Sequence, residues 1–195
     1  MISRLEQQFK FVMEIDQLKH IYRQNLVADG SRRENDVEHS WHLAVMAILL
    51  QEYTAEQVDV AKVMKMVLLH DLVEIDAGDT FAYDPEAGLD KGEREKAAAD
   101  RLYALLPADQ QGELRQLWEE FETGESPEAK FAACLDRLHP LLNNYHTQGG
   151  TWQSHNVSSD QVRRRMEPIG ESSPVLGAYV ESLIEDAIAQ GILKK

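Results

Sequence analysis

His70 and Asp71 stand side by side at the end of an apolar segment, VLLHD, and Glu74 follows shortly after them. Because the apolar spacing of this segment predicts a helix, Glu74 is expected one turn beyond the pair and on the same side. An imidazole and a carboxylate together suit a divalent metal of the first transition row. A nearby carboxylate that stays off the metal can take a proton from a bound water molecule. The segment therefore suggests a metal site, although a helix end decorated with polar residues would show the same dipeptide.

Two more residues of ligand type stand among apolar neighbours elsewhere in the chain. His39, in ENDVEHSWHL, lies near the start of an expected helix, and Asp136, in FAACLDRLHP, lies at the edge of an apolar helical stripe. A buried carboxylate is costly unless it is paired or bound to a metal. Either residue alone could be structural, but with His70 and Asp71 they form the ordered pattern H...HD...D.

This ordered set, with its flanking segments GSRRENDVEHSWHLA and HDLVEIDAGDT, resembles the HD-domain metal-dependent phosphohydrolases. The subgroup that it resembles most is the one containing the 5'-deoxynucleotidases, and the resemblance covers roughly residues 15 to 145. It implies an all-α fold, an HD-domain helical bundle. It also implies that Glu74 and Asp79 are the two catalytic carboxylates around the attacking water. The metal ligands that it implies are His39, His70, Asp71 and Asp136.

The distribution of histidines favours one divalent metal per chain. No histidine lies between Asp71 and Asp136, whereas the two-metal HD phosphodiesterases and the di-iron HD oxygenases add histidines in that interval. The identity of the metal (Mn, Co, Mg, Fe, Ni or Zn) stays open. The other histidines considered as ligands are expected on the surface or behind the ligand set: His42, His139, His146 and His155.

The reaction that this resemblance implies is the hydrolysis of a phosphate monoester. Such a substrate carries about two negative charges, so its hydrolysis needs a Lewis acid, a positioned water and cationic side chains. We expect the metal to act as the Lewis acid, and Asp79, or Glu74 through a water, to orient and deprotonate the nucleophile. Arg23 is the first choice for binding the phosphate, and Arg32 and Arg33 are the alternatives.

The expected substrate is a nucleoside monophosphate, in particular a deoxyribonucleoside 5'-monophosphate. Aromatic residues in and near two expected loops, Phe81, Tyr83 and Trp152, could stack on its base, unless they pack into the core instead. Base recognition is expected in the loop from Phe81 to Gly88 and in the segment TQGGTWQSHNV.

Two other classes of protein fit parts of this pattern. One is an HD domain that binds a nucleotide as a regulatory module without turnover, but Glu74 and Asp79 beside a complete ligand set favour an enzyme. The other is a helical interaction protein with accidental polar clusters, which would require all four ligand matches to be coincidental. Metal content, followed by phosphate release from a panel of nucleoside monophosphates, would separate the three.

The elements that must position these residues are helices. Apolar residues recur near the 3.6-residue period along most of the chain, and we expect no strand. Segments rich in turn-forming residues, such as ADGSRREND and TQGGTWQSHNVSS, separate the helices. The helices are expected over about 5–18, 37–53, 55–73, 91–105, 107–121, 126–146, 160–169 and 174–190.

Composition places the chain among ordinary globular proteins. Its 195 residues can bury a sizeable core, so we expect one HD-type domain over residues 1–195. The net charge of -14 disfavours binding to nucleic-acid polymers and anionic membranes. The single cysteine, Cys134, excludes an internal disulfide and is expected in the core. No signal peptide is apparent, and no apolar run approaches the roughly 20 residues of a membrane span. We therefore expect a cytoplasmic protein, and a homodimer as is common among helical HD proteins of this size.

Overall fold

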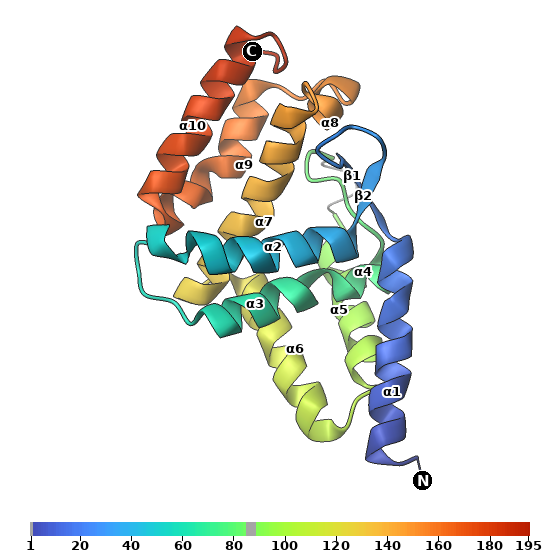
Figure 1. Ribbon diagram of the computed structural model, residues 1–195. Helices are drawn as coiled ribbons and strands as arrows, with labels where there is room; N and C mark the ends of the chain where they lie inside the picture. The colour runs from blue at the N-terminus through green and yellow to red at the C-terminus, as the bar shows by residue number, and fades with distance from the viewer. Residues whose placement is uncertain (1, 85–88) are drawn as a thin grey trace.

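The computed structural model describes residues 2–84 and 89–195. Within these ranges the chain is helical apart from a small two-stranded hairpin, which confirms the predicted all-α class (Figure 1). The helices are α1 (Arg4–Glu14), α2 (Asp36–Leu50), α3 (Val60–Leu69), α4 (Glu74–Ala77), α5 (Lys91–Tyr103), α6 (Ala108–Thr123), α7 (Pro127–His146), α8 (Gly150–Ser154), α9 (Ser159–Ser172) and α10 (Pro174–Ala189).

The hairpin corrects the expectation that the chain has no strand. Strands β1 (Tyr22–Leu26) and β2 (Arg33–Asn35) pair antiparallel with an irregular register, and the turn between them includes Gly30 at a φ of 72°. These strands are short and mostly polar, YRQNL and REN, so they lack the apolar alternation that marks a half-buried strand. The hairpin packs against α7 and α8, and it therefore carries Arg23 and Glu34 toward the interior.

The start of α2 is set by a reciprocal pair of side-chain hydrogen bonds. Asn35 accepts the backbone N–H of Glu38, and the Glu38 carboxylate accepts the backbone N–H of Asn35. This capping box satisfies two backbone donors that a helix start would leave unpaired. It begins the helix at Asp36, so that Asp36 and His39 lie on one face near the N-terminus of α2.

The segment that carries His70 and Asp71 is not the continuous helix that was expected over 55–73. The side chain of Asp59 accepts the N–H groups of Ala61 and Lys62, so α3 begins only at Val60. The α-helix then ends at Leu69 and continues as a 3₁₀ helix over His70–Val73 before α4. Because a 3₁₀ helix is wound more tightly than an α-helix, side chains along it point in different directions from those assumed for the sequence prediction.

The remaining helix boundaries lie near the predicted ones. The α-helical part of α2 ends at Leu50, and a 3₁₀ helix over Gln51–Tyr53 completes the predicted segment. A 3₁₀ helix over Ile15–His20 likewise completes the first predicted helix. The main addition is α8, which lies inside the loop that was expected after His146.

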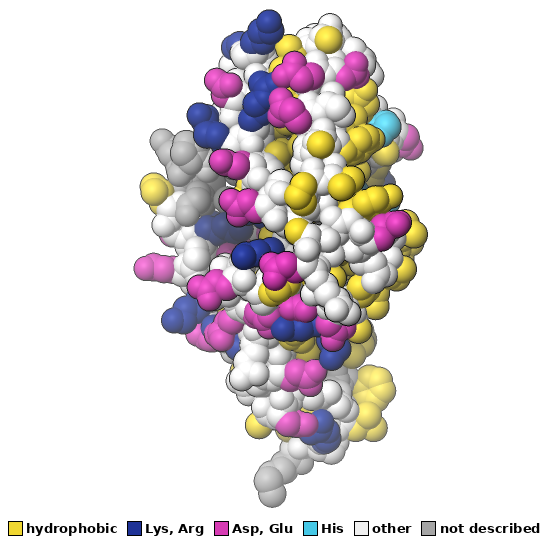
Figure 2. All heavy atoms as spheres, turned by 90° about the vertical axis from the view of Figure 1, so that its left-hand side faces the viewer, with side chains coloured by type: hydrophobic (Ala, Val, Ile, Leu, Met, Phe, Trp, Pro, Cys, Tyr) yellow, Lys and Arg dark blue, Asp and Glu magenta, His cyan; other side chains and the backbone are white. Residues whose placement is uncertain are grey.

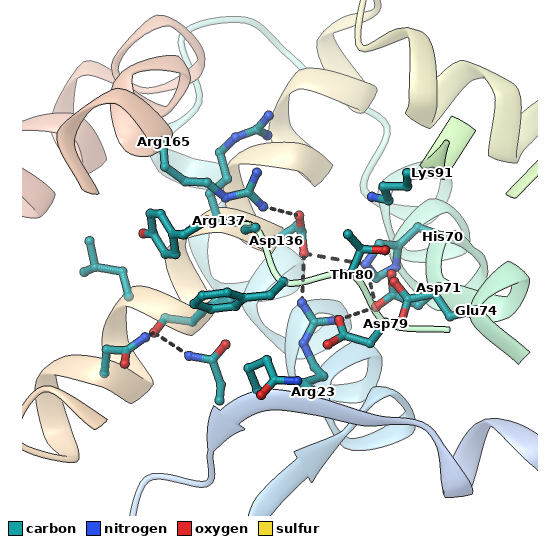
Figure 3. Close-up of a pocket in the computed structure, with 18 of the residues that line it drawn as sticks. Arg23, His70, Asp71, Glu74, Asp79, Thr80, Lys91, Asp136, Arg137 and Arg165 are labelled. Carbon is teal, nitrogen blue, oxygen red and sulfur yellow. Dashed lines mark hydrogen bonds and ion pairs between the residues drawn. The ribbon is translucent and has the colours of Figure 1, made fainter. Parts of the chain in front are cut away.

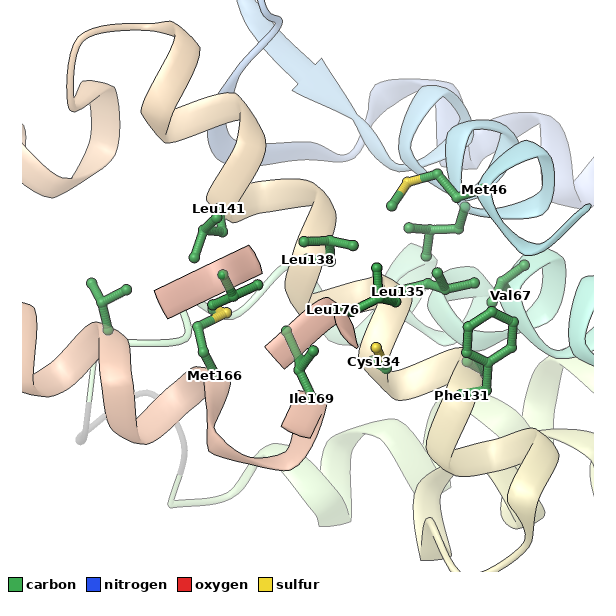
Figure 4. Close-up of a cluster of buried hydrophobic side chains, with 14 of the residues drawn as sticks. Met46, Val67, Phe131, Cys134, Leu135, Leu138, Leu141, Met166, Ile169 and Leu176 are labelled. Atoms are coloured by element: carbon green, nitrogen blue, oxygen red, sulfur yellow. The ribbon is translucent and has the colours of Figure 1, made fainter. Parts of the chain in front are cut away.

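Two clusters of buried apolar side chains hold these helices together. The larger one joins α2, α3, α7, α9 and α10, with Phe131, Leu135 and Leu138 of α7 at its centre (Figure 4). Cys134 belongs to it at 1% exposure, which confirms that this cysteine is a core residue. The smaller cluster joins α1, α5 and α6 and includes Val73. Since Val67 packs in the larger cluster, the His70–Val73 turn lies where the two cores meet.

Among the described residues, no helix combines the length and the apolar composition needed to cross a lipid bilayer.

Candidate functional site

The four predicted ligand residues come from three separate elements and converge on one point (Figure 3 labels three of them). His39 Nε2 of α2 lies 3.1 Å from Asp136 Oδ1 of α7 and 4.0 Å from Asp71 Oδ2. His70 Nε2, in the 3₁₀ helix, lies 3.1 Å from Asp71 Oδ2 and 3.7 Å from Asp136 Oδ1. The structure therefore brings together two imidazole nitrogens and two carboxylate oxygens that the sequence separates by up to 97 residues.

The donor atoms of this group fit a divalent metal. His70 Nδ1 lies 2.9 Å from the backbone oxygen of Val67, so Nδ1 carries a proton, and in the neutral ring Nε2 presents a lone pair. Nε2 is buried and lacks a hydrogen-bond partner among the described residues. A lone pair that faces two carboxylates is unfavourable unless a proton or a cation lies among them. Two imidazole nitrogens with two carboxylates are ligands that first-row divalent metals accept.

The charges in this group also favour a cation. Burial alone would raise the pKa of Asp71, but His70 and Arg23 outweigh it and hold that pKa well below its usual range. Burial likewise opposes ionisation of Asp136, yet the neighbouring rings of His39 and His70 lower its pKa. The same carboxylates overcome the effect of burial on His70 and raise its pKa to about 10. Burial lowers the pKa of His39 to about 4, so this ring stays neutral and can act as a ligand.

Arg23 enters the site from β1 and is enclosed by carboxylates. Its Nη1 donates to Asp71 Oδ2 at 2.7 Å and to Asp36 Oδ1 at 3.3 Å, and its Nη2 lies 3.8 Å from Asp136 Oδ1. Burial disfavours the charge of Arg23, but the carboxylates outweigh it and raise its pKa above the usual value. Arg23 therefore fixes the orientation of Asp71, besides lining the cavity described below.

Arg32 and Arg33, the alternatives to Arg23, lie elsewhere. Arg32 is exposed and bonds the carboxylate of Glu38 through both terminal nitrogens, at 2.8 and 2.6 Å. Arg33 is exposed at the start of β2. Neither side chain lines the cavity that contains Arg23. The structure thus separates three arginines that stand close together in the sequence.

A second group of carboxylates adjoins the first. Donor oxygens of Asp36, Glu74 and Asp79 all lie within 4.8 Å of one another. Asp36 and Glu74 are buried, and one oxygen of each, Oδ2 and Oε2, has no hydrogen-bond partner in the described part of the chain. Burial raises the pKa of all three carboxyls, and repulsion from Asp71 adds to it. Carboxyl groups with raised pKa values next to a metal-type site suit proton transfer.

Asp36 was not identified from the sequence. Its pKa is raised to about 7, and it occupies the first position of α2, three residues before His39. This spacing places the two residues on one face of a helix. The expected helix began at residue 37, one residue after the observed start, so the spacing of Asp36 and His39 in ENDVEH was a usable signal.

A cavity of about 840 Å³, its open mouth included, lies beside these two groups. Its wall carries cationic residues that the sequence analysis did not identify: Lys91 of α5, Arg137 of α7 and Arg165 of α9. Figure 3 shows Arg137 and Arg165 on one side of Asp136 and Lys91 on the other.

The two arginines on that wall have few partners. Arg137 Nη1 donates to the backbone oxygen of Ala133 at 2.9 Å, and no carboxylate of the described residues lies within ion-pair distance of it. Arg165 Nη2 lies 3.8 Å from Asp136 Oδ2. Burial and the charge of Arg165 lower the pKa of Arg137. Two guanidinium groups held near one another with little compensation form a favourable site for an anion.

The aromatic residues expected to meet a base have different environments. Trp152 is 2% exposed and packs in the larger core cluster, although it also reaches the cavity wall. Phe81 and Tyr83 are half-buried in the wall, with ring centroids 5.5 Å apart. Phe81 also contacts the ring of His155 at 4.4 Å. Residues 85–88 of the same predicted recognition loop lie outside the described residues.

Comparison with known proteins gives consistent matches. A family model described as HD domain matches residues 15–176. The 5'-deoxynucleotidase HDDC2 of Bos taurus is 34% identical over 134 residues, which are 68% of this chain and 64% of that protein. Its Homo sapiens counterpart is 33% identical over the same share of each chain. The chain thus spans less than two thirds of the length of these relatives.

Solved structures give a fuller match. A protein of Magnetospirillum magnetotacticum MS-1, described as a predicted metal-dependent phosphohydrolase, is 52% identical with a TM-score of 0.95, over 99% of this chain and 97% of the other. The PH0347 protein of Pyrococcus horikoshii OT3 is 22% identical with a TM-score of 0.65, over 92% and 97% of the two chains, and shares the fold.

Proposed function

The chain belongs to the HD domain family, and from this premise we propose that it is a metal-dependent phosphomonoesterase acting on nucleoside monophosphates. The observation that carries the proposal is the meeting of a metal-type ligand group with a cluster of carboxyls of raised pKa, at a cavity whose wall also carries Arg23, Lys91, Arg137 and Arg165. Deoxyribonucleoside 5'-monophosphates are the proposed substrates, because the similar proteins of known name are 5'-deoxynucleotidases.

We propose that the ligand group holds one divalent cation, of the Mn, Co, Mg, Fe, Ni or Zn type. When bound, such an ion polarises a phosphoryl oxygen and lowers the pKa of a bound water. The chain contributes two imidazole nitrogens and two carboxylates, and Arg23 keeps Asp71 in place. The proposed ligands are His39, His70, Asp71 and Asp136.

The second carboxylate group is proposed to move the proton. Asp79, in the loop after α4, takes a proton from the attacking water, either directly or with Glu74 and an intervening water. The water oxygen then bonds to phosphorus as the bond between phosphorus and the 5'-oxygen breaks. The proton returns to the leaving 5'-oxygen, so the products are a nucleoside and inorganic phosphate. Burial raises the pKa of both carboxyls, which makes each of them a stronger base than an exposed carboxylate.

Arg23, Arg137 and Arg165 are proposed to bind the phosphate. Arg23 is shared with three carboxylates, so its charge is largely compensated. Arg137 and Arg165 have more unused N–H donors, and an arginine can bind two phosphate oxygens at once. Arg32 and Arg33 are not included, since both are exposed away from the cavity.

The test is to measure metal content and then phosphate release from a panel of deoxyribo- and ribonucleoside 5'-monophosphates. The proposal expects a bound divalent metal and faster release from the deoxyribonucleotides. A protein with metal that releases no phosphate from any substrate would instead be the alternative, a nucleotide-binding regulatory module. A protein with neither metal nor turnover would be a helical interaction protein.

The proposed enzyme is one HD-type domain over residues 1–195 and assembles as a homodimer in the cytoplasm. Large apolar side chains on the outer faces of α1 and α2 support self-association, among them Phe9 and Trp41, each 60% exposed. Figure 2 shows hydrophobic side chains gathered toward the right-hand side of its view. Burying such surface in a subunit contact is favourable. Light scattering that shows a monomer at micromolar concentration would reject the homodimer.

A further inference from the structure

A buried polar cluster lies behind His39 and has no part in the chemistry proposed above. His39 Nδ1 lies 3.0 Å from His139 Nδ1 of α7. His139 Nε2 lies 3.7 Å from Glu34 Oε1 of β2, and Asn143 Nδ2 donates to Glu34 Oε2 at 3.4 Å. All four side chains are buried. Since burying polar groups opposes folding unless they are satisfied, the arrangement calls for an explanation beyond packing.

The contact between the two rings couples their protonation. Of two neutral imidazole nitrogens at hydrogen-bond distance, one must donate and the other must accept. If His139 were the donor, His39 would carry its own proton on Nε2, the atom that faces Asp136 and Asp71. If His39 is the donor, its Nε2 presents a lone pair to those carboxylates. His139 then carries its proton on Nε2, which lies 3.7 Å from Glu34 Oε1.

We infer that His139 and Glu34 are positioning residues that hold His39 in the tautomer able to bind a metal through Nε2. The inference rests on the ligand role of His39 in the proposed function. A metal-bound imidazole usually donates its second N–H directly to a carboxylate or a carbonyl oxygen. Here His39 donates instead to a second ring, that of His139, and the carboxylate of Glu34 supports His139. Asp136, His139 and Asn143 follow one another at helical spacing on α7. One face of α7 therefore supplies both a ligand and the support for another ligand.

A second cation site is the competing interpretation, because donor atoms of Glu34, His39 and His139 lie within 4.8 Å of one another. The ligand role proposed for His39 argues against it, because an ion bound here would use Nδ1 of a ring whose Nε2 already faces the proposed metal site. His39 would then have to bind cations through both nitrogens and so give up its proton. A direct hydrogen bond between the two Nδ1 atoms, 3.0 Å apart, needs no such change.

The first test measures the affinity of the metal-free protein for Mn²⁺ or Zn²⁺ by competition with a chelator. His139→Leu keeps a similar volume but has no acceptor, and we expect its affinity to fall by about 10- to 100-fold. His139→Asn returns an oxygen acceptor near the position of Nδ1 and is expected to recover most of the loss. The matched control is His42→Leu, because the exposed His42 ring contacts His139 at 4.5 Å but faces none of the ligand atoms.

A second test needs no variant and stays decisive if His139→Leu fails to fold. In the zinc-loaded wild-type protein, nitrogen NMR of the rings should find His139 protonated at Nε2 and unprotonated at Nδ1. A proton on Nδ1 of His139, an unchanged affinity in a folded His139→Leu, or two bound ions per chain would overturn the inference. These outcomes are separate from the enzymatic proposal. A protein that shows the predicted affinities and tautomer but releases no phosphate would refute the activity and leave the positioning role standing.

Discussion

Two groups of buried carboxyls adjoin one another in this protein, and their surroundings differ. Asp71 and Asp136 face two histidines and an arginine, and their pKa values lie below the usual range. Asp36, Glu74 and Asp79 face mainly one another and Asp71, and their pKa values lie above it. Burial acts on both groups in the same direction, so the sign of the difference comes from the neighbouring charges. One group suits a cation and the other suits a proton, which is how adjacent carboxyls acquire separate roles.

The most severe way to test this division is to remove a carboxylate from the ligand group. We expect Asp71→Ala to lose stoichiometric metal binding and to reduce phosphate release to background, because it removes a proposed ligand and the main partner of Arg23. Elemental analysis and a phosphate assay check both effects. Unchanged metal binding in this variant would remove Asp71 from the ligand set. Two tightly held metals per wild-type chain would refute the single-ion site.

In the other group, Asp79→Asn should separate chemistry from metal binding. The substitution keeps shape and hydrogen bonding but removes the basicity, so we expect unchanged metal content and phosphate release lower by about 10²-fold or more. Glu74→Gln should also slow turnover while sparing the metal. Loss of the metal in Asp79→Asn would show that Asp79 is a ligand, and the two carboxyl groups would then not have separate roles. Full activity would transfer the role of base to Glu74.

The raised pKa of Asp36 predicts a pH-dependent stability in the metal-free protein. Its pKa is about 7 in the folded state against 3.8 ordinarily. Between these values the folded state binds more protons than the unfolded state, so this residue makes stability fall as pH rises. Near pH 8, the free energy of unfolding from urea titration should therefore be higher for Asp36→Asn than for wild type, by about 1 kcal/mol or more. Near pH 4 we expect little difference between the two proteins. Equal stability of the two proteins near pH 8 would show that Arg23 fully compensates Asp36.

The smallest expected effect tests whether Arg165 binds the phosphate of the substrate or only pairs with Asp136. We expect Arg165→Met to raise KM by about tenfold with little change in metal affinity, the scale of one charge-assisted hydrogen bond. The control is Arg164→Met, since Arg164 lies outside the main cavity and forms no ion pair within the described residues. An unchanged KM with an altered metal affinity would assign Arg165 to the ligand group instead.

Much of the candidate site could be proposed from the sequence because its strongest signals are local. His70 and Asp71 are neighbours, and Glu74 and Asp79 follow within one short segment. The all-α class followed from a periodicity that most of the helices obey, and the family resemblance was confirmed by the match over residues 15–176. The hairpin was missed because its short polar strands lack the alternation of apolar and polar residues that marks a half-buried strand. The 3₁₀ helix at His70 was missed because apolar spacing does not distinguish it from the end of an α-helix.

The sequence by itself determined which kinds of atoms were available: imidazoles and carboxylates in the order H...HD...D, and several arginines ahead of them. The tertiary structure alone decided which of these atoms meet. It carried Arg23 among the carboxylates and left Arg32 and Arg33 in solvent. It also placed His139 against His39 across 100 residues. The physical reason is that hydrogen bonds and ion pairs act over a few ångströms, so partners distant in the chain become partners only when the packing of α2, α7 and the hairpin brings them into contact.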